Sequence, residues 1–223
     1  MQRRVPRLVL AGTNSGCGKT TVTCAVLQAL ISRGLRVGAA KCGPDYIDPM
    51  FHRTVLETDS CNLDPWFLDH QALRELLAFR CREKDVAVLE GVMGYYDGLG
   101  GTSDRASSYK VAAATDTPVV LVVPGRGMSK SLVPLIKGFV QYRPDSHIAG
   151  VILNRISKGM YPLLKQMVEE ELAEANGGKG IRVLGYVPEL TDPFLTGRHL
   201  GLVLPEEIPE VQTQMEKLGR FLR

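Results

Sequence analysis

A glycine-rich stretch near the start of the chain, residues 12–21, limits the possible folds more than any other feature. It reads Gly-Thr-Asn-Ser-Gly-Cys-Gly-Lys-Thr-Thr, follows the apolar run 8–11 and precedes apolar residues spaced three and four apart. Strand, glycine-rich turn and helix in that order are typical of a phosphate-binding loop, whose backbone N–H groups face the anion. The pattern predicts that Lys19 reaches the terminal phosphates of a nucleotide and that the Thr20 hydroxyl holds a magnesium ion.

The loop departs from the strict phosphate-loop pattern at one position. That pattern has a glycine five residues before Gly18, where this chain has Thr13, and Gly12 comes one place too early. The alternative is a turn that only connects a strand to a helix. We favour the phosphate loop because Gly-Lys-Thr with these flanks rarely arises for structural reasons alone. The residues predicted to bind the nucleotide are Thr13, Asn14, Ser15, Gly16, Cys17, Gly18, Lys19, Thr20 and Thr21.

Length and composition limit the class of protein. A chain of 223 residues with 23% charged and 44% hydrophobic residues is typical of one soluble domain. A net charge of +3 is too small to indicate nucleic acid or a membrane as a partner, and no apolar run approaches a membrane span. The five cysteines are widely spaced and odd in number, which indicates neither a disulfide framework nor a zinc site. We therefore expect a cytoplasmic protein without a signal peptide.

Apolar runs alternate with segments of helical periodicity along the chain. The runs are β-branched and nearly continuous in hydrophobicity, as are strands buried on both faces. This alternation predicts an α/β fold: a doubly wound, mostly parallel sheet flanked by helices, with ligands at the carboxyl ends of the strands. Strands are expected at 8–11, 37–40, 86–89, 119–123, 148–153 and 181–185. Helices are expected at about 19–33, 70–81, 107–114, from 131, from 162 to 176, and from 209 to the end.

The segment after the second predicted strand places one lysine and two aspartates around a Gly-Pro turn. Lys41 can neutralise charge on a transferring phosphoryl group. Asp45 and Asp48 can hold magnesium directly or through water. The alternative is that either aspartate caps a turn. We favour function for the segment as a whole, and the turn for Asp48 and its following proline considered alone.

A glutamate closes the third predicted strand. A carboxylate at this point, downstream of a phosphate loop, is the usual second contact of magnesium, and we assign that role to Glu90. The glycine-rich residues 91–101 that follow, including Asp97, either close over a substrate or form a flexible surface loop. Asn154, at the end of the fifth predicted strand, is either a purine contact or a turn residue.

Seven segments form one combined pattern. They are Gly12-Thr13-x-Ser15-Gly16-x-Gly18-Lys19-Thr20-Thr21, Lys41-x-Gly43-Pro44-Asp45-Tyr46-Ile47-Asp48, Asn62-Leu63-Asp64, Glu90-Gly91-Val92-Met93-Gly94-x-Tyr96-Asp97-Gly98, Gly150-Val151-Ile152-Leu153-Asn154-Arg155, Leu184-Gly185-Tyr186-Val187-Pro188 and Arg198-His199-Leu200-Gly201-Leu202. Together they resemble the N-terminal domain of the cobyrinic acid a,c-diamide synthase family over nearly the whole chain. The resemblance implies a P-loop NTPase fold of the dethiobiotin synthetase type.

The resemblance also implies an activity, the ATP-dependent amidation of the a and c acetate carboxylates of cobyrinic acid in cobalamin biosynthesis. ATP would phosphorylate the carboxylate, because a carboxylate is a poor electrophile, and ammonia would displace the phosphate. The protein's task is then positioning and charge neutralisation. The implied cofactors are ATP and Mg²⁺. The implied partners are a corrinoid or other tetrapyrrole carboxylate, ammonia from a glutaminase domain or chain, and a second copy of the chain in a homodimer.

Residue roles follow from the resemblance by position. It implies magnesium contacts for Thr20, Asp45 and Glu90, catalytic roles for Lys19, Lys41, Asp48 and Asp97, and an adenine contact for Asn154. It implies substrate contacts for Tyr46, Asp48, Asp97, Ser107 and Ser108. A substrate with many carboxylates also favours cationic neighbours, for which the candidates are His52, Arg53, Arg105 and Arg155.

The chain departs from the family in two ways. Family members carry a C-terminal glutaminase domain, and this chain ends at Arg223, before such a domain could fit. We therefore expect residues 1–204 to form the ATP-binding synthetase domain and residues 205–223 to form a tether and helix leading toward an absent glutaminase. The chain would be a fragment, or the partner of a separate glutaminase chain. In addition, Pro124 stands where the family usually has an aspartate.

Two other functions stay open. A switch ATPase of the partitioning type shares this fold but has a second lysine five residues before the loop lysine, where this chain has Asn14. A nucleotide-sensing domain without catalysis tends to lose the lysine or acidic residues, and this chain keeps all four, namely Lys19, Lys41, Asp45 and Glu90. Both features favour the amidating enzyme.

Overall fold

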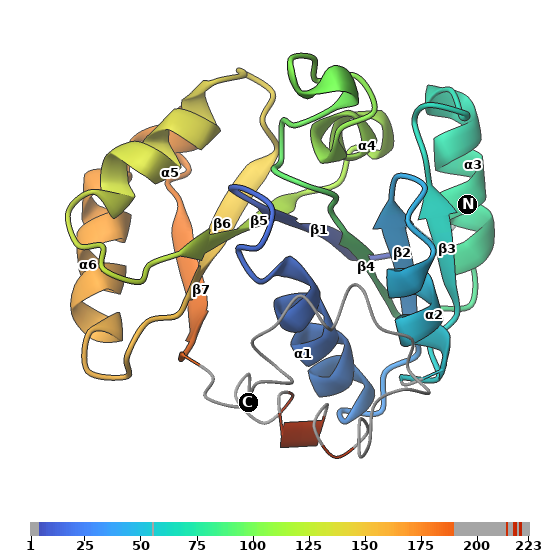
Figure 1. Cartoon of the computed structure of the whole chain (residues 1–223), viewed down its shortest axis with the longest axis horizontal. Helices are drawn as coiled ribbons and strands as arrows, with labels where there is room; N and C mark the ends of the chain where they lie inside the picture. Colours follow the sequence, from blue (N-terminus) through green and yellow to red (C-terminus); the bar gives the residue numbers. More distant parts are fainter. Residues whose placement is uncertain (1–4, 55, 190–212, 214–215, 218, 220–223) are drawn as a thin grey trace.

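Seven strands form one sheet at the centre of the computed structural model, which describes residues 5–54, 56–189, 213, 216–217 and 219 (Figure 1). Every described strand pair is parallel, so the predicted doubly wound α/β sheet is confirmed. In order across the sheet, the strands are β3 (Ser60–Leu63), β2 (Val37–Cys42), β4 (Val86–Glu90), β1 (Arg7–Gly12), β5 (Val119–Pro124), β6 (Ile148–Asn154) and β7 (Arg182–Val187). Because β1 lies between β4 and β5, the loop that leaves its carboxyl end lies at the middle of the sheet edge.

Helices cover both faces of the sheet. In Figure 1 the sheet runs across the middle, with the first helix below it and the fourth above it. On one face lie α1 (Lys19–Ile31) and α2 (Ile47–Thr54). On the other lie α3 (His70–Cys81), α4 (Ser108–Thr115), α5 (Leu132–Gln141), α6 (Tyr161–Glu171) and the short α7 (Ala175–Gly178).

Two hydrophobic cores result, because alternate residues of a strand point to opposite faces. Val9 and Ala11 of β1 pack into the core under α3–α6, whereas Leu10 packs into the core under α1 and α2. All three are at most 1% exposed. Burial on both faces is why the sequence of these strands is hydrophobic without alternation.

Two elements near the site were not predicted. The strand β3 has only four residues, and its third, Asn62, is polar, so it lacks the apolar run expected of a buried strand. The helix α2 contains Pro49, which resembles the end of a turn in sequence but lies in the first helical turn, where proline is tolerated. The predicted helix from 209, the tether 205–223 and the segment 198–202 lie wholly or mostly outside the described residues.

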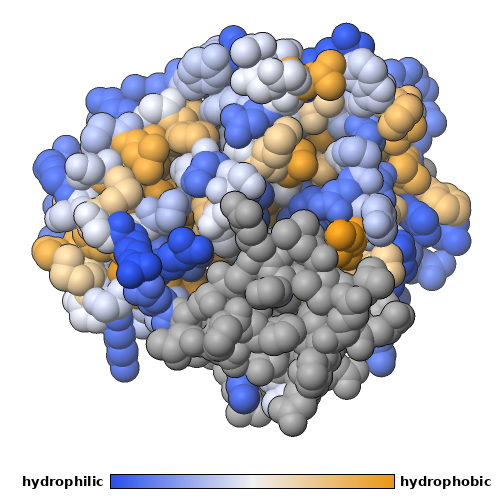
Figure 2. Space-filling view, viewed as in Figure 1, coloured by the Kyte–Doolittle hydropathy of each residue, from blue (hydrophilic) through white to orange (hydrophobic). Residues whose placement is uncertain are grey.

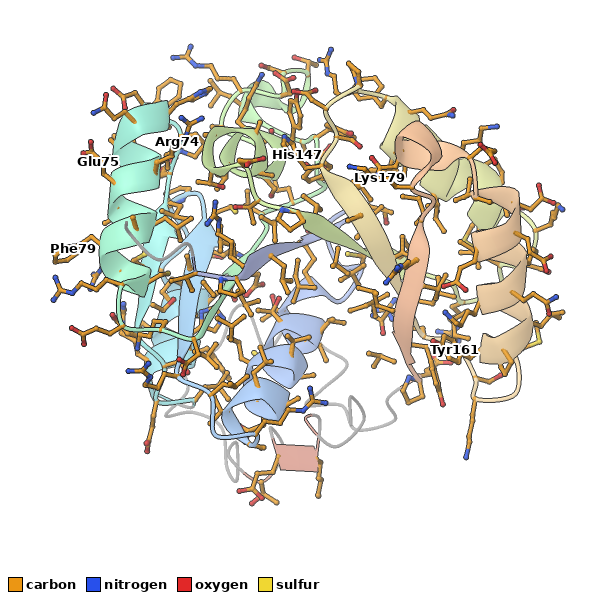
Figure 3. The ribbon with its side chains drawn as sticks, turned by 180° about the vertical axis from the view of Figure 1, so that it is seen from behind. Arg74, Glu75, Phe79, His147, Tyr161 and Lys179 are labelled. Atoms are coloured by element: carbon orange, nitrogen blue, oxygen red, sulfur yellow. The ribbon has the colours of Figure 1, made fainter. Side chains whose placement is uncertain are left out.

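Specific contacts fix the outer helices. Asp69 caps α3, since its Oδ1 accepts the N–H of Ala72 at 2.8 Å. Figure 3, which views the molecule from behind, shows Arg74 of α3 beside α4, where its guanidinium donates to the Ala114 carbonyl. Tyr161 at the start of α6 stacks on Tyr186 of β7, with ring centroids 4.5 Å apart.

Hydrophobic side chains are scattered among hydrophilic ones over the described part of the face in Figure 2. Among the described residues, no helix combines the length and the apolar character needed to cross a membrane.

Candidate active site

The loop between β1 and α1 has the backbone of an anion-binding loop. Gly16 and Gly18 have φ angles of 78° and 96°, in the left-handed region that favours glycine. Asn14, Ser15 and Gly16 are exposed at the carboxyl edge of the sheet, directly before the first turn of α1. The predicted phosphate loop is therefore in the place and conformation that anion binding requires.

Gly12 explains the irregular glycine spacing. A Cβ at this last residue of β1 would lie 2.2 Å from Cys17 Sγ and 2.9 Å from Lys19 Cγ. The loop thus needs a glycine one place earlier than the strict pattern, because the buried Cys17 side chain folds back underneath it. Cys17 acts here as a small buried residue, 1% exposed.

Lys19 lies under the loop rather than in solvent. Its Nζ donates to the Asn14 carbonyl at 3.0 Å and lies 3.9 Å from Cys17 Sγ, and the residue is 8% exposed. Burial lowers the pKa of Lys19 from its usual value. The ammonium is thus held at the loop by one carbonyl, and the predicted contact with terminal phosphates stays a prediction.

Four side chains from four elements form a charged cluster beside the loop. Glu90 Oε1, at the end of β4, accepts from the Thr20 hydroxyl at 2.6 Å and from Lys41 Nζ at 3.2 Å. Lys41, at the end of β2, also donates to the Gly91 carbonyl at 3.1 Å and forms an ion pair with Asp48 of α2. Lys41, Asp48 and Glu90 are 4%, 2% and 0% exposed. Thr20 and Glu90, two of the three predicted magnesium contacts, therefore lie together, and their roles toward a metal stay predictions.

One buried cation faces two buried carboxylates in this cluster, and the pKa values of the two carboxylates shift in opposite directions. Burial raises the pKa of Asp48 to about 7, assisted by the charge of Glu90 and opposed by Lys41. Burial also opposes ionisation of Glu90, but Lys41, the neighbouring His52 ring and the hydrogen bond from Thr20 outweigh it and hold the pKa of Glu90 below its usual value. For Lys41, burial favours loss of the proton, but the two carboxylates raise the pKa above its usual value. The stable charge pair is therefore Lys41 with Glu90, and Asp48 is the group that gains a proton near neutrality.

His52 lies behind this cluster. Predicted as a cationic neighbour of the substrate, it is 0% exposed, so that prediction is wrong. Its Nε2 is 3.4 Å from Glu90 Oε2, a contact that does not form a hydrogen bond, and its Nδ1 is 3.0 Å from Ser60 Oγ.

Asp45 and Tyr46 flank the cluster without entering it. Asp45 Oδ1 accepts the N–H of Ile47 at 3.0 Å, so this aspartate caps the start of α2. Asp48 lies inside that helix and pairs with Lys41, so the turn interpretation applies to Asp45 and not to Asp48. Asn62 Nδ2 donates to the carbonyls of Gly43 and Asp45 at 2.9 and 2.7 Å and fixes the whole β2–α2 loop. Tyr46 is 65% exposed beside it.

The loop after β4 lies next to the phosphate loop. Tyr95 N–H donates to the Gly12 carbonyl at 2.8 Å, and exposed Asp97 accepts the Gly94 N–H at 2.9 Å. Asp97 is thus held near the phosphate loop, where a substrate contact was predicted. A pocket of about 780 Å³ extends from Asp97 toward α5, with Tyr96, Phe139, Tyr142 and Arg143 among its walls.

Ser107 and Ser108 differ from their predicted role. Both are 0% exposed. Ser107 caps α4, and Ser108 Oγ bonds both backbone groups of Val92, at 2.8 and 3.1 Å. Their hydroxyls bind backbone, so direct substrate contact from either is not supported.

Asn154 and Arg155, at the end of β6, hold the phosphate loop from the other side. Asn154 Nδ2 donates to the Cys17 carbonyl at 2.8 Å, and the Arg155 guanidinium donates to the Gly16 carbonyl at 3.3 Å. A Cβ on Gly18 would lie 2.2 Å from Asn154 Nδ2. The Asn154 amide therefore has a structural partner, and its adenine contact stays a prediction. A pocket of about 530 Å³ opens here between the ends of β5, β6 and β7.

Thr20 and Glu90 fit a magnesium ion that binds together with phosphate. Glu90 Oε1 and the Thr20 hydroxyl lie 2.6 Å apart, so two oxygen donors meet at the start of α1, directly after the loop. Magnesium is usually held by one or two protein oxygens, with phosphate oxygens and waters completing the shell. In the described part of the chain, no three His, Cys, Asp or Glu side chains are grouped so as to hold a metal by themselves. The hydroxyl and carboxylate suit a shared metal–phosphate site, whereas Asp45 Oδ1 caps the start of α2 and the magnesium contact of Asp45 stays a prediction.

Sequence reasoning did not predict that Ser60 belongs to the site. It also did not predict that His52 is buried behind Glu90. Ser60 is in the unpredicted strand β3, and His52 is in the unpredicted helix α2. A signal existed for His52, since it lies four residues after Asp48 and so on the same face of a helix.

Comparison with known proteins identifies a family that matches most of the chain and relatives that are about 40% identical to it. Residues 8–199 match the family described as CobQ/CobB/MinD/ParA nucleotide binding domain. The chain is 40% identical over 217 residues to a cobyrinate a,c-diamide synthase of Priestia megaterium and 41% identical over 218 residues to that of Thermoplasma volcanium. Each alignment covers 97% of this chain and 46% of the relative, so the chain spans about half the length of these curated relatives.

A solved structure agrees on the fold. A MinC:MinD cell division protein complex from Aquifex aeolicus matches with a TM-score of 0.56 at 17% identity, over 97% of this chain and 95% of that one. At this identity the likeness concerns the P-loop fold alone.

Proposed function

Because the chain belongs to the CobQ/CobB/MinD/ParA nucleotide binding domain family, we propose that it binds ATP with magnesium and activates a carboxylate for amidation. The substrate we propose is cobyrinic acid or a close tetrapyrrole, whose a and c acetates would become amides in cobalamin biosynthesis. The chemistry named for its 40% identical relatives supports this substrate.

The observation that carries the proposal is the buried Lys41–Glu90 pair beside the Thr20 hydroxyl. A regulatory nucleotide site has no need for a second lysine and two carboxylates buried beside the loop. Phosphoryl transfer does, because negative charge must be neutralised between two anionic reactants.

Each residue has a defined task in this proposal. The loop N–H groups and Lys19 would bind the terminal phosphates, while Thr20 and Glu90 would hold a magnesium ion, which would supply charge neutralisation. Lys41 would neutralise charge where the incoming carboxylate meets the phosphate. An acyl phosphate forms when a carboxylate oxygen attacks the terminal phosphorus and ADP leaves. Ammonia then attacks the acyl carbon and phosphate leaves, which gives the amide.

The two pockets suit the two ends of the site. The nucleoside would occupy the pocket of about 530 Å³ beside Arg155, since it adjoins the loop. The tetrapyrrole would lie beside Tyr46 and in the pocket of about 780 Å³ that contains Asp97, whose aromatic walls suit a flat macrocycle. Arg105, exposed and 4.7 Å above the Trp66 ring, remains a candidate for pairing a substrate carboxylate.

We also propose an ammonia source, a homodimeric assembly and a cytoplasmic location for the chain. The chain would receive ammonia from a glutaminase domain or chain and act as a homodimer, which light scattering tests. Five free cysteines, all buried, agree with a reducing cytoplasm.

The test measures ADP formation with ATP, Mg²⁺, cobyrinic acid and ammonium chloride as the nitrogen source. We expect turnover to require the tetrapyrrole and to yield amide, and Glu90→Gln to lower it by about 100-fold or more. Glu75→Gln, at an exposed position of α3 that points outward in Figure 3, is the matched control and should not change the rate. ADP formation that is independent of the tetrapyrrole, or a rate unchanged by Glu90→Gln, would contradict the proposal.

A further inference from the structure

We propose that His52 and Ser60 form a buried relay that positions Glu90 for the metal–phosphate site. The inference rests on the proposed function only in taking Glu90 as a magnesium contact. It concerns metal binding, which can be measured without amidation.

The relay connects three elements behind the site. His52 lies one helical turn after Asp48 in α2, so the helix that supplies one member of the charged cluster also places the imidazole behind Glu90. Ser60 begins β3, and its hydroxyl is 3.0 Å from His52 Nδ1, while His52 Nε2 is 3.4 Å from Glu90 Oε2. His52 and Glu90 are 0% exposed and Ser60 is 2% exposed, so water does not compete for these contacts.

Chemistry fixes the direction of the donors. An ionised carboxylate only accepts hydrogen bonds, so the ring nitrogen that faces Glu90 must carry a hydrogen. In a neutral imidazole, Nδ1 then accepts from the Ser60 hydroxyl. Ser60 therefore selects the tautomer that presents N–H to Glu90.

The two oxygens of Glu90 have different surroundings. Oε1 is held by the Thr20 hydroxyl at 2.6 Å and by Lys41 at 3.2 Å. Oε2 and His52 Nε2 face each other, and neither has a hydrogen-bond partner in the described part of the chain. A buried donor and a buried acceptor left unpaired are unfavourable for the folded state. A small turn of the carboxylate would pair them and fix the orientation of Oε1 beside Thr20.

Binding of Mn²⁺ tests the relay, measured by electron paramagnetic resonance with a non-hydrolysable ATP analogue. Removing a partner of a metal-binding carboxylate typically weakens metal affinity about 10–100-fold. We expect that loss for His52→Leu and a smaller loss for Ser60→Ala. In His52→Gln, the side-chain amide can place a donor near the position of Nε2, which faces Glu90. In His52→Asn, the amide reaches only the position of Nδ1, which faces Ser60. We therefore expect His52→Gln to bind Mn²⁺ more tightly than His52→Asn.

Controls separate positioning from folding. Ser146→Ala removes another buried serine hydroxyl and should leave Mn²⁺ affinity unchanged. Each variant is compared by circular dichroism and by affinity for the nucleotide without metal. A folded His52→Leu with wild-type Mn²⁺ affinity overturns the inference. If that variant does not fold, Ser60→Ala decides: reduced Mn²⁺ affinity supports the relay and unchanged affinity overturns it. If the native protein does not amidate the tetrapyrrole but the His52 and Ser60 variants still bind Mn²⁺ more weakly, the proposed reaction is contradicted and the relay is supported.

Discussion

Replacing Asp48 by asparagine is expected to stabilise the protein against unfolding at alkaline pH while it impairs the reaction. Asp48 is the second carboxylate around the single cation Lys41, and it is 2% exposed. One ammonium cannot fully compensate two buried negative charges. Asparagine keeps the shape and an oxygen that can accept from Lys41, and it removes the surplus charge.

The size of the effect follows from the pKa. Burial raises the pKa of Asp48 from 3.8 to about 7 in the folded protein. A folded-state pKa above the unfolded value means that the carboxyl favours the folded state fully below about pH 4, and that this contribution is lost as pH rises through about 7. Between about pH 5.5 and pH 8, the unfolded carboxylate is already ionised, and the folded one loses its proton at a free-energy cost of about 2 kcal/mol. The variant avoids this cost.

Urea unfolding without nucleotide or magnesium measures the difference. The free energy of unfolding of Asp48→Asn, relative to the native protein, should be about 2 kcal/mol more favourable at about pH 8 than at about pH 5.5. Any constant loss from the weaker hydrogen bond to Lys41 cancels in this comparison. Asp97→Asn, at an exposed aspartate, is the control without such a gain. If the variant and the native protein respond to pH in parallel, the surplus-charge reasoning is refuted.

Three further outcomes are expected. Gly12→Ala places a Cβ 2.2 Å from Cys17 Sγ, so it should destabilise the fold by about 1–3 kcal/mol in thermal unfolding and weaken ATP binding. The control Gly138→Ala, in α5, places a Cβ in open space and should be neutral or stabilising in the same measurement. Asn154→Ala leaves a loop carbonyl without its donor and should weaken binding of a fluorescent ATP analogue several-fold; an unchanged affinity would show that the loop holds its shape alone. Tyr95→Phe removes a fully buried hydroxyl that donates to a backbone carbonyl at 2.6 Å, and should lower the free energy of unfolding by about 1–2 kcal/mol in urea without affecting nucleotide affinity.

The central part of the fold was readable from the sequence because its signals are local. The strands β1, β2, β4, β5 and β6 are apolar runs, and a strand buried on both faces has to be one. The edge strand β7 is only partly buried, but its apolar residues were sufficient to predict it. Lys41 and Glu90 could be brought together because each ends such a run, and parallel strands end at the same edge. In the structure β2 and β4 are neighbours, and Lys41 lies directly opposite Glu90.

Sequence reasoning failed where the role of a residue depends on a packing contact that its sequence neighbours do not reveal. Ser107 and Ser108 look like polar loop residues, and only packing shows that they bind backbone. His52 looks like a surface cation until the short helix α2 places it behind Glu90. Gly12 looks one position out of register because the contact that requires a glycine involves Cys17, five residues later.

The order of the strands also determines which parts of the site are synthesised first. The four strands β3, β2, β4 and β1 come from the first 90 residues and form one continuous half of the sheet. Lys41 and Glu90 lie at the ends of two strands of that half, and Asp48 and His52 lie in α2, which joins β2 to β3. Asn154 and Arg155 lie at the end of β6, two strands from β1 on the other side. As the chain leaves the ribosome, every charged member of the cluster is made before β5 exists to cover the open edge of β1. The two side chains that hold the phosphate loop from the other side are therefore synthesised only after every charged member of the cluster.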